Sequence, residues 1–493
     1  MPTAPHPADH PPRDLAETTY DVVVVGAGPT GENVADHASR GGLSVVVVEV
    51  ELAGGECSYW ACIPSKALLR PVQALDAARS VAGSSAAVTG ELDVDAVLAR
   101  RDSFTHDYDD SSQVDWLEDT GIALVRGTGR LVGERQVEVT GPAGDTVELT
   151  ARHAVVLCTG SAAALPPVDG LDAVDPWTSR DATGAKSAPR TLAVLGGGVV
   201  GVEMATAWRA LGTQQVTVLQ RGDRLLPTYE PEVGERLAAA LRQRGVDVRL
   251  RTEVTRAERT ADGQVRLTTG DGVVEADEVL VAAGRRPRTD GLGLEVVGLE
   301  PGYLQTDDSL RVTGVDGGWL YAAGDCTGRA LLTHQGKYQA RVCGEAIAAR
   351  AAGNPAADAQ VPWTRFSATA DHRAVPQVVF SQPQVASVGL TEARARERGL
   401  EVVTATYELG QIAGAALAAD GYSGWAKLVV DAQRRTVVGA TFLGPDVAEL
   451  LHSATVAIVG EVPLDRLWHA VPAFPTISEV WLRLLDQLPR DAG

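Results

Sequence analysis

The stretch Gly26-Ala27-Gly28-Pro29-Thr30-Gly31 decides the fold of the N-terminal part of the chain. It follows a valine-rich run at residues 20–25 and precedes a helical pattern, after which a second valine-rich run ends in Glu49. In such a unit Gly26, Gly28 and Gly31 let the backbone approach a pyrophosphate at a helix N-terminus. An acid about twenty residues further on, here Glu49, accepts a hydrogen bond from a ribose hydroxyl. The stretch therefore predicts a doubly wound α/β domain that binds a dinucleotide.

The same pattern returns later in the chain. A strand at residues 192–195 leads into Gly196, Gly198 and Gly201, and a further strand follows at residues 216–219. Two such patterns predict two doubly wound domains that bind two different nucleotides.

The residue after the second strand differs in charge between the two sites. In the first site this residue is Glu49, whereas in the second site it is the neutral Gln220, which Arg221 and Arg224 follow. A missing carboxylate with nearby arginines accommodates a 2′-phosphate, which favours NADPH, with NADH as the alternative. The alternative for the arginines themselves is an ordinary solvated position.

Two cysteines, Cys57 and Cys62, lie within residues 54–66, directly after the second valine-rich run and Glu49. On a regular helix their spacing corresponds to about 7.5 Å of axial rise, so a bridge between them requires an irregular first turn. Cys62 precedes a helix-forming run, and the nearby Lys66 and the helix N-terminus both favour a thiolate. We interpret the two as a redox pair. The alternatives are a structural disulfide, two buried thiols and half of a zinc site, for which the other cysteines are too scattered.

Three further turns follow buried strands and could contact a ligand through their backbone N–H groups. They are the turn Thr159-Gly160-Ser161, the turn at Gly284, and the turn at Gly324 and Asp325. Asp325 could bind a sugar-like hydroxyl, although a plain glycine-aspartate turn explains the pattern equally well.

Composition excludes several classes of partner. The chain has 493 residues, 45% of them hydrophobic, and a formal charge of −20. An acidic surface repels phosphates, so we expect no nucleic acid and no membrane partner. No apolar run approaches the roughly eighteen residues of a membrane span, and the polar, proline-rich start is unlike a secretory leader. We therefore expect a cytoplasmic protein with several cores and a disordered tail at residues 1–19.

Taken together, these motifs give the chain a family likeness. It resembles the FAD-dependent pyridine nucleotide-disulfide oxidoreductases, which include glutathione reductase, dihydrolipoamide dehydrogenase and mercuric reductase. The resemblance covers nearly everything after residue 19 and rests on both glycine turns, the cysteine stretch, Thr159 to Ser161, Glu203, the turn at Asp325 and the C-terminal part.

The resemblance implies a role for each motif. FAD occupies the first site, with Glu49 on its adenosine ribose and Asp325 on its ribityl chain. Cys62 is the thiolate that faces the flavin and Cys57 is the exposed interchange thiol. Lys66 lies near the flavin and pairs with Glu203, which helps to seat the nicotinamide.

The chain departs from the family pattern near its C-terminus. Family members that reduce small dithiol substrates carry a catalytic histidine a few residues before a glutamate, here Glu479, and Phe474 occupies that histidine position. Because phenylalanine cannot transfer a proton, the acid-base step loses its residue, at a cost of about 10²- to 10⁴-fold. His469 is a candidate replacement, although a lone histidine is more often structural.

We therefore predict an α/β protein with two doubly wound dinucleotide-binding domains and a C-terminal α+β dimerisation domain. The FAD-binding domain is split over residues 20–170 and 300–362, the NAD(P)-binding domain spans residues 171–299, and the dimerisation domain spans residues 366–493. The expected assembly is a homodimer.

The expected activity is transfer of electrons from NAD(P)H through flavin and a Cys57–Cys62 disulfide to a small disulfide or other small-molecule acceptor. One alternative is direct reduction of a quinone, dye or metal ion by the flavin without the cysteines. A second alternative is a non-catalytic flavoprotein that senses redox state. No resident metal is expected.

Overall fold

The structure, a computed structural model, describes residues 17–489. Residues 1–16, most of the predicted disordered tail, lie outside the described residues, so that expectation stays a prediction. The first strand, β1 (Thr19–Val25), begins one residue before the expected start. Within residues 17–489, no helix combines the length and the apolar character needed to cross a membrane.

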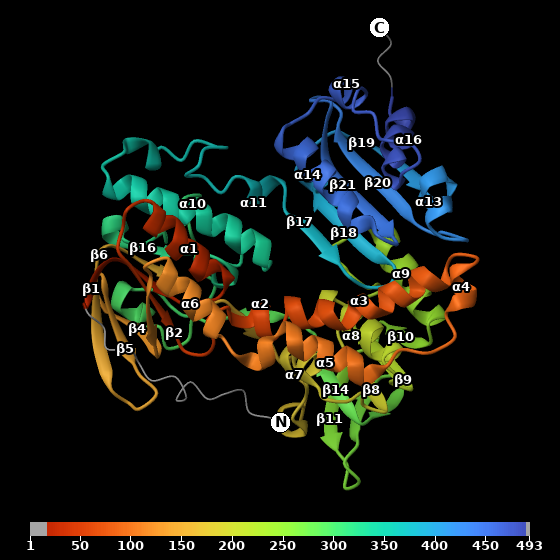
Figure 1. Cartoon of the computed structure of the whole chain (residues 1–493), viewed down its shortest axis with the longest axis horizontal. Coiled ribbons are helices and arrows are strands. Elements are labelled where there is room, and N and C mark those ends of the chain that lie inside the picture. Colours follow the sequence, from red (N-terminus) through yellow and green to blue (C-terminus); the bar gives the residue numbers. More distant parts are fainter. Residues whose placement is uncertain (1–16, 490–493) are drawn as a thin grey trace. The chain divides into compact units, whose positions relative to one another are not determined.

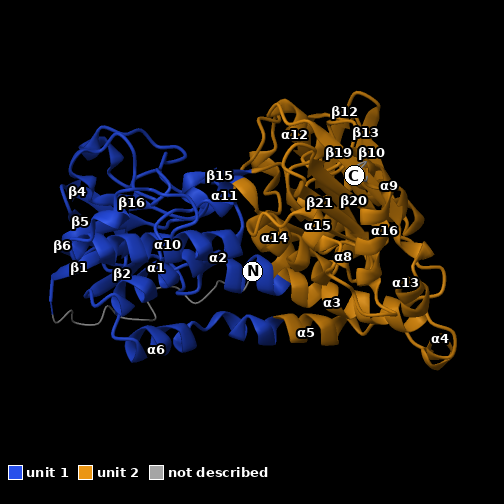
Figure 2. Ribbon diagram, turned by 90° about the horizontal axis from the view of Figure 1, so that it is seen from above, with its two compact units in different colours: residues 1–64, 102–162, 285–372 blue, residues 65–101, 163–284, 373–493 orange. Residues whose placement is uncertain are grey.

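The described chain forms two compact units, which Figure 2 shows in different colours. Unit 1 contains the chain up to Pro64, Asp102–Ala162 and Arg285–His372, and unit 2 contains Ser65–Arg101, Ala163–Gly284 and the chain from Arg373 onward. The second glycine turn and the C-terminal part thus fall within one unit. The domain boundaries expected from the sequence stay predictions.

Unit 1 is built on a sheet whose strands have the order β3-β2-β1-β6-β5-β4, with β16 paired to β6. Its strands β1, β2, β3 and β16 are parallel to the second half of β6, whereas β4 and β5 form an antiparallel hairpin with its first half. The bounds are β2 (Val45–Glu49), β3 (Ala123–Arg126), β4 (Thr128–Gly133), β5 (Gln136–Thr140), β6 (Thr146–Leu157), β15 (Arg285–Pro287), β16 (Leu320–Ala322), α1 (Pro29–Arg40), α2 (Gly55–Tyr59), α6 (Ser111–Asp119) and α10 (Thr333–Ala351).

The valine runs are continuous because both faces of this sheet are buried. Val22 and Val24 pack with α1 and α10, which lie side by side (Figure 1), while Val23 and Val25 pack on the opposite face. The buried strand expected near residues 154–158 is the second half of the long strand β6. Its first half alternates polar and apolar residues and pairs with β5.

Unit 2 holds a parallel sheet of order β10-β9-β8-β14, an antiparallel sheet of order β11-β12-β13 and an antiparallel sheet of order β17-β18-β21-β20-β19. The strands are β8 (Thr191–Leu195), β9 (Gln215–Gln220), β10 (Val246–Leu250), β11 (Val254–Arg259), β12 (Val265–Thr269), β13 (Gly272–Ala276), β14 (Glu278–Val281), β17 (Pro376–Val379), β18 (Gln384–Gly389), β19 (Val402–Glu408), β20 (Trp425–Asp431) and β21 (Thr436–Gly444). The helices are α4 (Ser84–Ala87), α7 (Ser179–Gly184), α8 (Val199–Ala210), α9 (Pro231–Gln243), α12 (Glu392–Glu397), α13 (Ala413–Ala418), α14 (Leu451–Val459), α15 (Leu464–Leu467) and α16 (Val480–Gln487). Four elements contain a boundary between the units, namely α3 (Cys62–Arg79), α5 (Val94–Phe104), β7 (Ser161–Ala163) and α11 (Ala370–Arg373).

The parallel sheet of unit 2 also has both faces covered. One face packs on α8 and α9 around the fully buried Trp208, and the other packs on the sheet of β11, β12 and β13. The C-terminal sheet packs on α14 and α16. The expected fold class, mixed α/β with a C-terminal domain of sheet and helices, is confirmed.

Candidate functional site

Cys57 and Cys62 stand on two different helices. Cys57 lies in α2, which ends before Trp60, and Cys62 is the first residue of α3. Trp60 leaves the helical region at φ −130° and ψ −3°, and this break supplies the irregular turn that the spacing requires. Both residues are half-buried free thiols, and Cys62 Sγ lies 3.2 Å from Thr333 Oγ1. The pKa of Cys57 is raised by its hydrogen bond to Cys62 and by burial, so Cys57 retains its proton.

The first glycine turn, between β1 and α1, has one tight side and one open side. Gly26 has φ +104°, and a Cβ on it would lie 2.5 Å from the carbonyl oxygen of Cys158. A Cβ on Gly31 would lie 1.8 Å from the carbonyl oxygen of Gly26, whereas a Cβ on Gly28 would meet no atom within 4 Å. The turn therefore packs closely against its own unit and leaves open space at Gly28 at the start of α1, where a phosphate would bind.

Glu49, at the end of β2, ties the strand end to this turn. Its Oε2 accepts a hydrogen bond from the Ala27 N–H at 2.6 Å, and its Oε1 accepts one from the Glu51 N–H at 2.7 Å. Burial raises the pKa of Glu49, and the two N–H donors oppose that rise.

The two expected turns of unit 1 meet at Ser161 and Asp325. Ser161 Oγ donates to Asp325 Oδ2 at 2.5 Å, and Arg285 Nε donates to Ser161 Oγ at 2.7 Å. Burial raises the pKa of Asp325, while Ser161 and Arg285 oppose that rise. Within the described chain, the buried Thr159 Oγ1 has no hydrogen-bond partner, and a Cβ on Gly160 would meet no atom within 4 Å.

The second glycine turn, between β8 and α8, repeats the geometry of the first. Gly196 has φ +110°, and a Cβ on it would lie 2.4 Å from the carbonyl oxygen of Ala282, while a Cβ on Gly201 would lie 2.0 Å from the carbonyl oxygen of Gly196. A Cβ on Gly198 would meet no atom within 4 Å, and the same holds for Gly284 at φ +149° in the turn after β14.

Gln220 accepts a hydrogen bond from the second glycine turn, as Glu49 does from the first. Its Oε1 accepts a hydrogen bond from the Gly197 N–H at 2.9 Å, so the strand end is tied to the turn without a negative charge. Arg221 is exposed. Arg224 donates to the Pro227 carbonyl at 3.2 Å, and its buried Nε has no hydrogen-bond partner within residues 17–489.

Lys66 and Glu203 form an ion pair inside unit 2. Lys66 Nζ, on α3, lies 2.8 Å from Glu203 Oε2, on α8, and the Glu203 side chain is only 4% exposed. The Phe380 N–H donates to Glu203 Oε1 at 2.9 Å, and the Phe380 ring centroid lies 5.0 Å from Lys66 Nζ. Both carboxylate oxygens are therefore satisfied, and the lysine charge is held between an anion and an aromatic face.

Near the C-terminus, Phe474 and Glu479 have different surroundings. Phe474 is 76% exposed. Glu479 is buried just before α16, and its Oε1 accepts from Arg483 at 2.5 Å, whereas its Oε2 has no hydrogen-bond partner in the described chain. His469, the candidate replacement, is exposed.

Three contact residues at these positions did not stand out in the sequence. They are Thr333 beside Cys62, Arg285 on Ser161, and Phe380 on the Lys66–Glu203 pair. Arg285 directly follows Gly284, so proximity to a flagged turn was the available signal. Nothing in the sequence distinguished Thr333 or Phe380, because both approach their partners through tertiary structure.

The residues present fit two nucleotides. Gly28, Gly160 and Gly198 leave open space at turns whose backbone would face a ligand, and Thr159 Oγ1 is a buried hydroxyl with no partner in the described chain. The first set lies in unit 1 with both cysteines, and Gly198 lies in unit 2 with the Lys66–Glu203 pair. Within residues 17–489, no group of three or more His, Cys, Asp or Glu is arranged to hold a metal ion.

Comparison with known proteins identifies the family of the chain. Residues 20–353 match the model of the pyridine nucleotide-disulphide oxidoreductase family, and residues 375–484 match its dimerisation domain. The chain is 30% identical over 476 residues to a mercuric reductase of Staphylococcus aureus, with 93% of this chain and 81% of that protein covered. It is 33% identical over 473 residues to a dihydrolipoyl dehydrogenase of Chlorobaculum tepidum, with 94% and 96% covered.

A solved structure gives the same result. The Cu(II) complex of the HOCl-induced flavoprotein disulfide reductase RclA from Escherichia coli superposes with a TM-score of 0.80 at 25% identity, covering 96% of this chain and 100% of that one. The chain therefore belongs to the pyridine nucleotide-disulphide oxidoreductase family, whose enzymes depend on FAD and bind NAD(P)H.

Proposed function

We propose that this protein passes electrons from NAD(P)H, by way of FAD, to a disulfide formed by Cys57 and Cys62, and from there to a small-molecule acceptor. When bound, FAD supplies the two-electron exchange between the nicotinamide and the cysteine pair. The observation that carries the proposal is the placement of the two thiols on adjoining helices, hydrogen-bonded to each other, directly after the unit formed by β1, the first glycine turn, α1 and β2.

The surroundings of the two cysteines would keep one protonated as a thiol and stabilise the other as a thiolate. Cys57 keeps its proton because its hydrogen bond to Cys62 and its partial burial raise its pKa. Cys62 stands at the N-terminus of α3, whose dipole favours a thiolate there. We assign Cys62 as the thiolate and Cys57 as the thiol that exchanges with the acceptor.

An anaerobic titration of the FAD-loaded protein with NADPH tests this path. We expect the flavin absorbance to bleach and a long-wavelength thiolate band to appear, and we expect Cys57→Ser to abolish reduction of disulfide acceptors. Cys343→Ser, which changes a buried thiol of α10, serves as the control and should retain the reaction. An unchanged rate in Cys57→Ser with every acceptor would contradict the proposal.

A second candidate function is direct reduction of a quinone, dye or metal ion by the flavin. It is favoured by the loss of the proton-transferring residue, since Phe474 stands at the histidine position and Glu479 is paired with Arg483. One relative is named a mercuric reductase, and the solved relative is a Cu(II) complex, so Hg(II) and Cu(II) belong in the acceptor panel. Turnover of a quinone or metal ion that survives a double Cys57→Ser, Cys62→Ser change would support this candidate, and its loss would count against it.

We propose NADPH as the preferred electron donor. Gln220 ties the second glycine turn without a carboxylate, and the exposed Arg221 follows it, so no negative charge at that position opposes a 2′-phosphate. The ratio of kcat/KM for NADPH to that for NADH tests the assignment. Arg221→Met should lower this ratio about tenfold, because the ion pair with the phosphate is lost while the shape is kept.

We also propose a homodimer that forms through the C-terminal domain. The match of residues 375–484 to a dimerisation domain supports it. That part of the chain also exposes apolar side chains, including Val456, Trp468 and Val471, which an interface would cover.

A further inference from the structure

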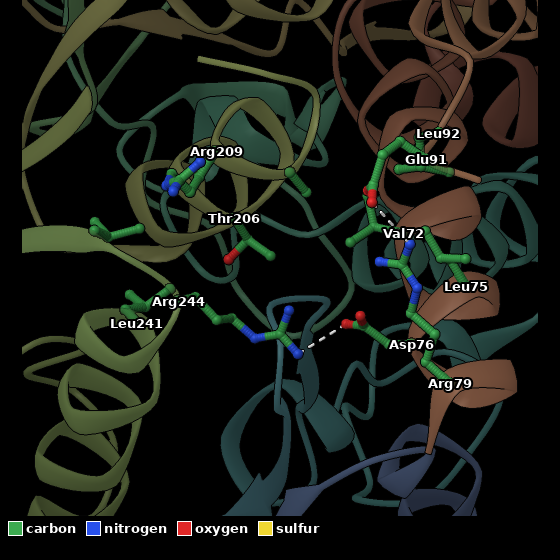
Figure 3. Close-up of a pocket in the computed structure, with 12 residues that line it drawn as sticks. Val72, Leu75, Asp76, Arg79, Glu91, Leu92, Thr206, Arg209, Leu241 and Arg244 are labelled. Atoms are coloured by element: carbon green, nitrogen blue, oxygen red, sulfur yellow. Dashed lines mark hydrogen bonds and ion pairs between the residues drawn. The ribbon is translucent and has the colours of Figure 1, made fainter. Parts of the chain in front are cut away.

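Unit 2 contains a cavity of about 340 Å³ between α3, α8 and α9 (Figure 3). Its volume is at the lower end of the roughly 300–1,000 Å³ typical of small-molecule pockets. Neither the glycine turns nor the Lys66–Glu203 pair contributes a residue to its lining. We propose that this cavity binds a small organic carboxylate with an aromatic or branched aliphatic body.

The charge of the lining favours an anion. Three arginines line the cavity, Arg79 from α3, Arg209 from α8 and Arg244 directly after α9, against two carboxylates, Asp76 and Glu91. The basic groups therefore outnumber the acidic ones, and Figure 3 shows the guanidinium groups of Arg79 and Arg244 each next to one of the two acids.

The two ion pairs differ in strength, and the third arginine has none. Arg244 lies 2.8 Å from Asp76, whereas Arg79 lies 3.3 Å from Glu91, whose side chain is 88% exposed and therefore a weak partner. Arg209 has no carboxylate partner within the described residues, and its buried Nε has no hydrogen-bond partner there. The one buried, unsatisfied polar side-chain atom of the lining within the described residues is thus an N–H donor of Arg209, and an anionic ligand would complement the charge of this guanidinium.

The rest of the lining determines the body of the ligand. Aliphatic side chains from three segments form it, namely Val72, Leu75, Leu92, Leu241 and Val246. A bare inorganic anion would leave this surface without contacts, whereas an apolar body would cover it. A carboxylate on an aromatic ring matches both parts of the lining.

The position of the cavity indicates an effector rather than a substrate. The helix α3 carries Lys66 and α8 carries Glu203, and their ion pair joins these two helices. A ligand held by Arg79 and Arg209 would bridge the same two helices further along their length. Its binding is measured directly, so the test does not depend on the proposed electron path.

Isothermal titration calorimetry of the full-length, FAD-loaded protein tests the proposal, with benzoate as the probe. We expect a dissociation constant of about 1 mM or tighter for benzoate, and binding at least about tenfold weaker for benzamide, a neutral molecule of the same shape. Arg209→Met and Arg244→Met should each weaken benzoate binding about tenfold or more. The matched control is Arg242→Met, which removes an exposed arginine of α9 outside the lining and should leave the affinity unchanged.

A second variant keeps the test decisive if an arginine variant fails to fold. Leu75→Trp fills the cavity from its half-buried wall without removing a charge, and it should abolish benzoate binding. The proposal is overturned if benzoate does not bind, if benzamide or sulfate binds as tightly, or if Leu75→Trp or both arginine variants bind benzoate as the unchanged protein does.

Discussion

At the scale of single residues, the buried carboxyl group of Glu32 has a raised pKa. Glu32, in the first turn of α1, is 8% exposed, and burial raises its pKa to about 7. The charged groups that face it are Lys337, which opposes the rise, and Glu49 and Asp110, which add to it, while the Gly54 N–H stabilises the charged form. Its Oε1 has no hydrogen-bond partner in the described chain.

This environment predicts a pH-dependent stability. In the unfolded chain Glu32 titrates near its ordinary value of 4.5, so below that pH both states are protonated and the residue costs nothing. As the pH rises from about 4.5 to about 7, the unfolded state loses its proton first and the folded state is destabilised, by about 3 kcal/mol at most. Glu32→Gln should therefore raise the Tm at about pH 8 and leave it nearly unchanged at about pH 4.5. Thermal melts of both proteins at the two pH values check this, and an equal shift at both would contradict it.

The Lys66–Glu203 pair gives a second prediction at this scale. Glu203→Gln keeps the oxygen that accepts from the Phe380 N–H but removes the negative charge beside Lys66. Because Lys66 is 35% exposed, solvent screens the loss and the fold should survive. We expect NADPH to reduce the bound flavin at least about tenfold more slowly, as measured by stopped-flow absorbance. Glu232→Gln, a half-exposed glutamate of α9, is the control, and an equal slowing in both variants would refute a specific role for Glu203.

At the scale of elements, the strand-turn-helix unit separates packing from ligand binding. A Cβ on Gly31 would lie 1.8 Å from the backbone of Gly26, so Gly31→Ala must disrupt the start of α1. A Cβ on Gly28 would meet no atom within 4 Å, and its φ of −69° suits alanine. Gly31 is therefore required by close packing within the protein, whereas Gly28 is required only if a ligand occupies the open space beside it.

We expect Gly28→Ala to fold with an unchanged melting temperature in the FAD-free form but to retain at least about tenfold less FAD, because the added methyl group occupies the space of the phosphate. Gly31→Ala should instead unfold at a clearly lower temperature whether or not FAD is added. Circular dichroism and the flavin absorbance of the purified proteins measure the two effects. Full FAD occupancy in Gly28→Ala would show that the open space at this turn is not used.

At the scale of the whole molecule, the proposed dimer concerns the C-terminal surface. Val471 is 78% exposed and lies in the segment that matches the dimerisation domain. Val471→Asp should shift the mass measured by light scattering from dimer towards monomer, because a charge buried in an interface is costly. The control is Val273→Asp, a 52% exposed residue of β13 outside that segment, which should not change the mass. A dimer unchanged by Val471→Asp would place the interface elsewhere.

Much of this organisation follows from local sequence pattern. The two glycine turns, the valine runs that flank them and the start of α3 near Cys62 are visible in short stretches, and the family resemblance adds that Phe474 occupies a histidine position. They are predictable because a glycine at positive φ, a strand buried on both faces and a residue type that cannot transfer a proton are each properties of one segment. The pairing of the first half of β6 with β5 was not predicted, since the alternation within one strand does not specify its partner.

The sequence by itself determined the fold class, and it predicted the two nucleotide sites and the redox role of the thiols, because each depends on the conformation or chemistry of neighbouring residues. Only the tertiary structure decided that the Phe380 N–H donates to Glu203, that Thr333 contacts Cys62, and that three arginines from different segments line one cavity. Those contacts join residues far apart in the chain, and no local pattern specifies which distant side chain will fill a given space.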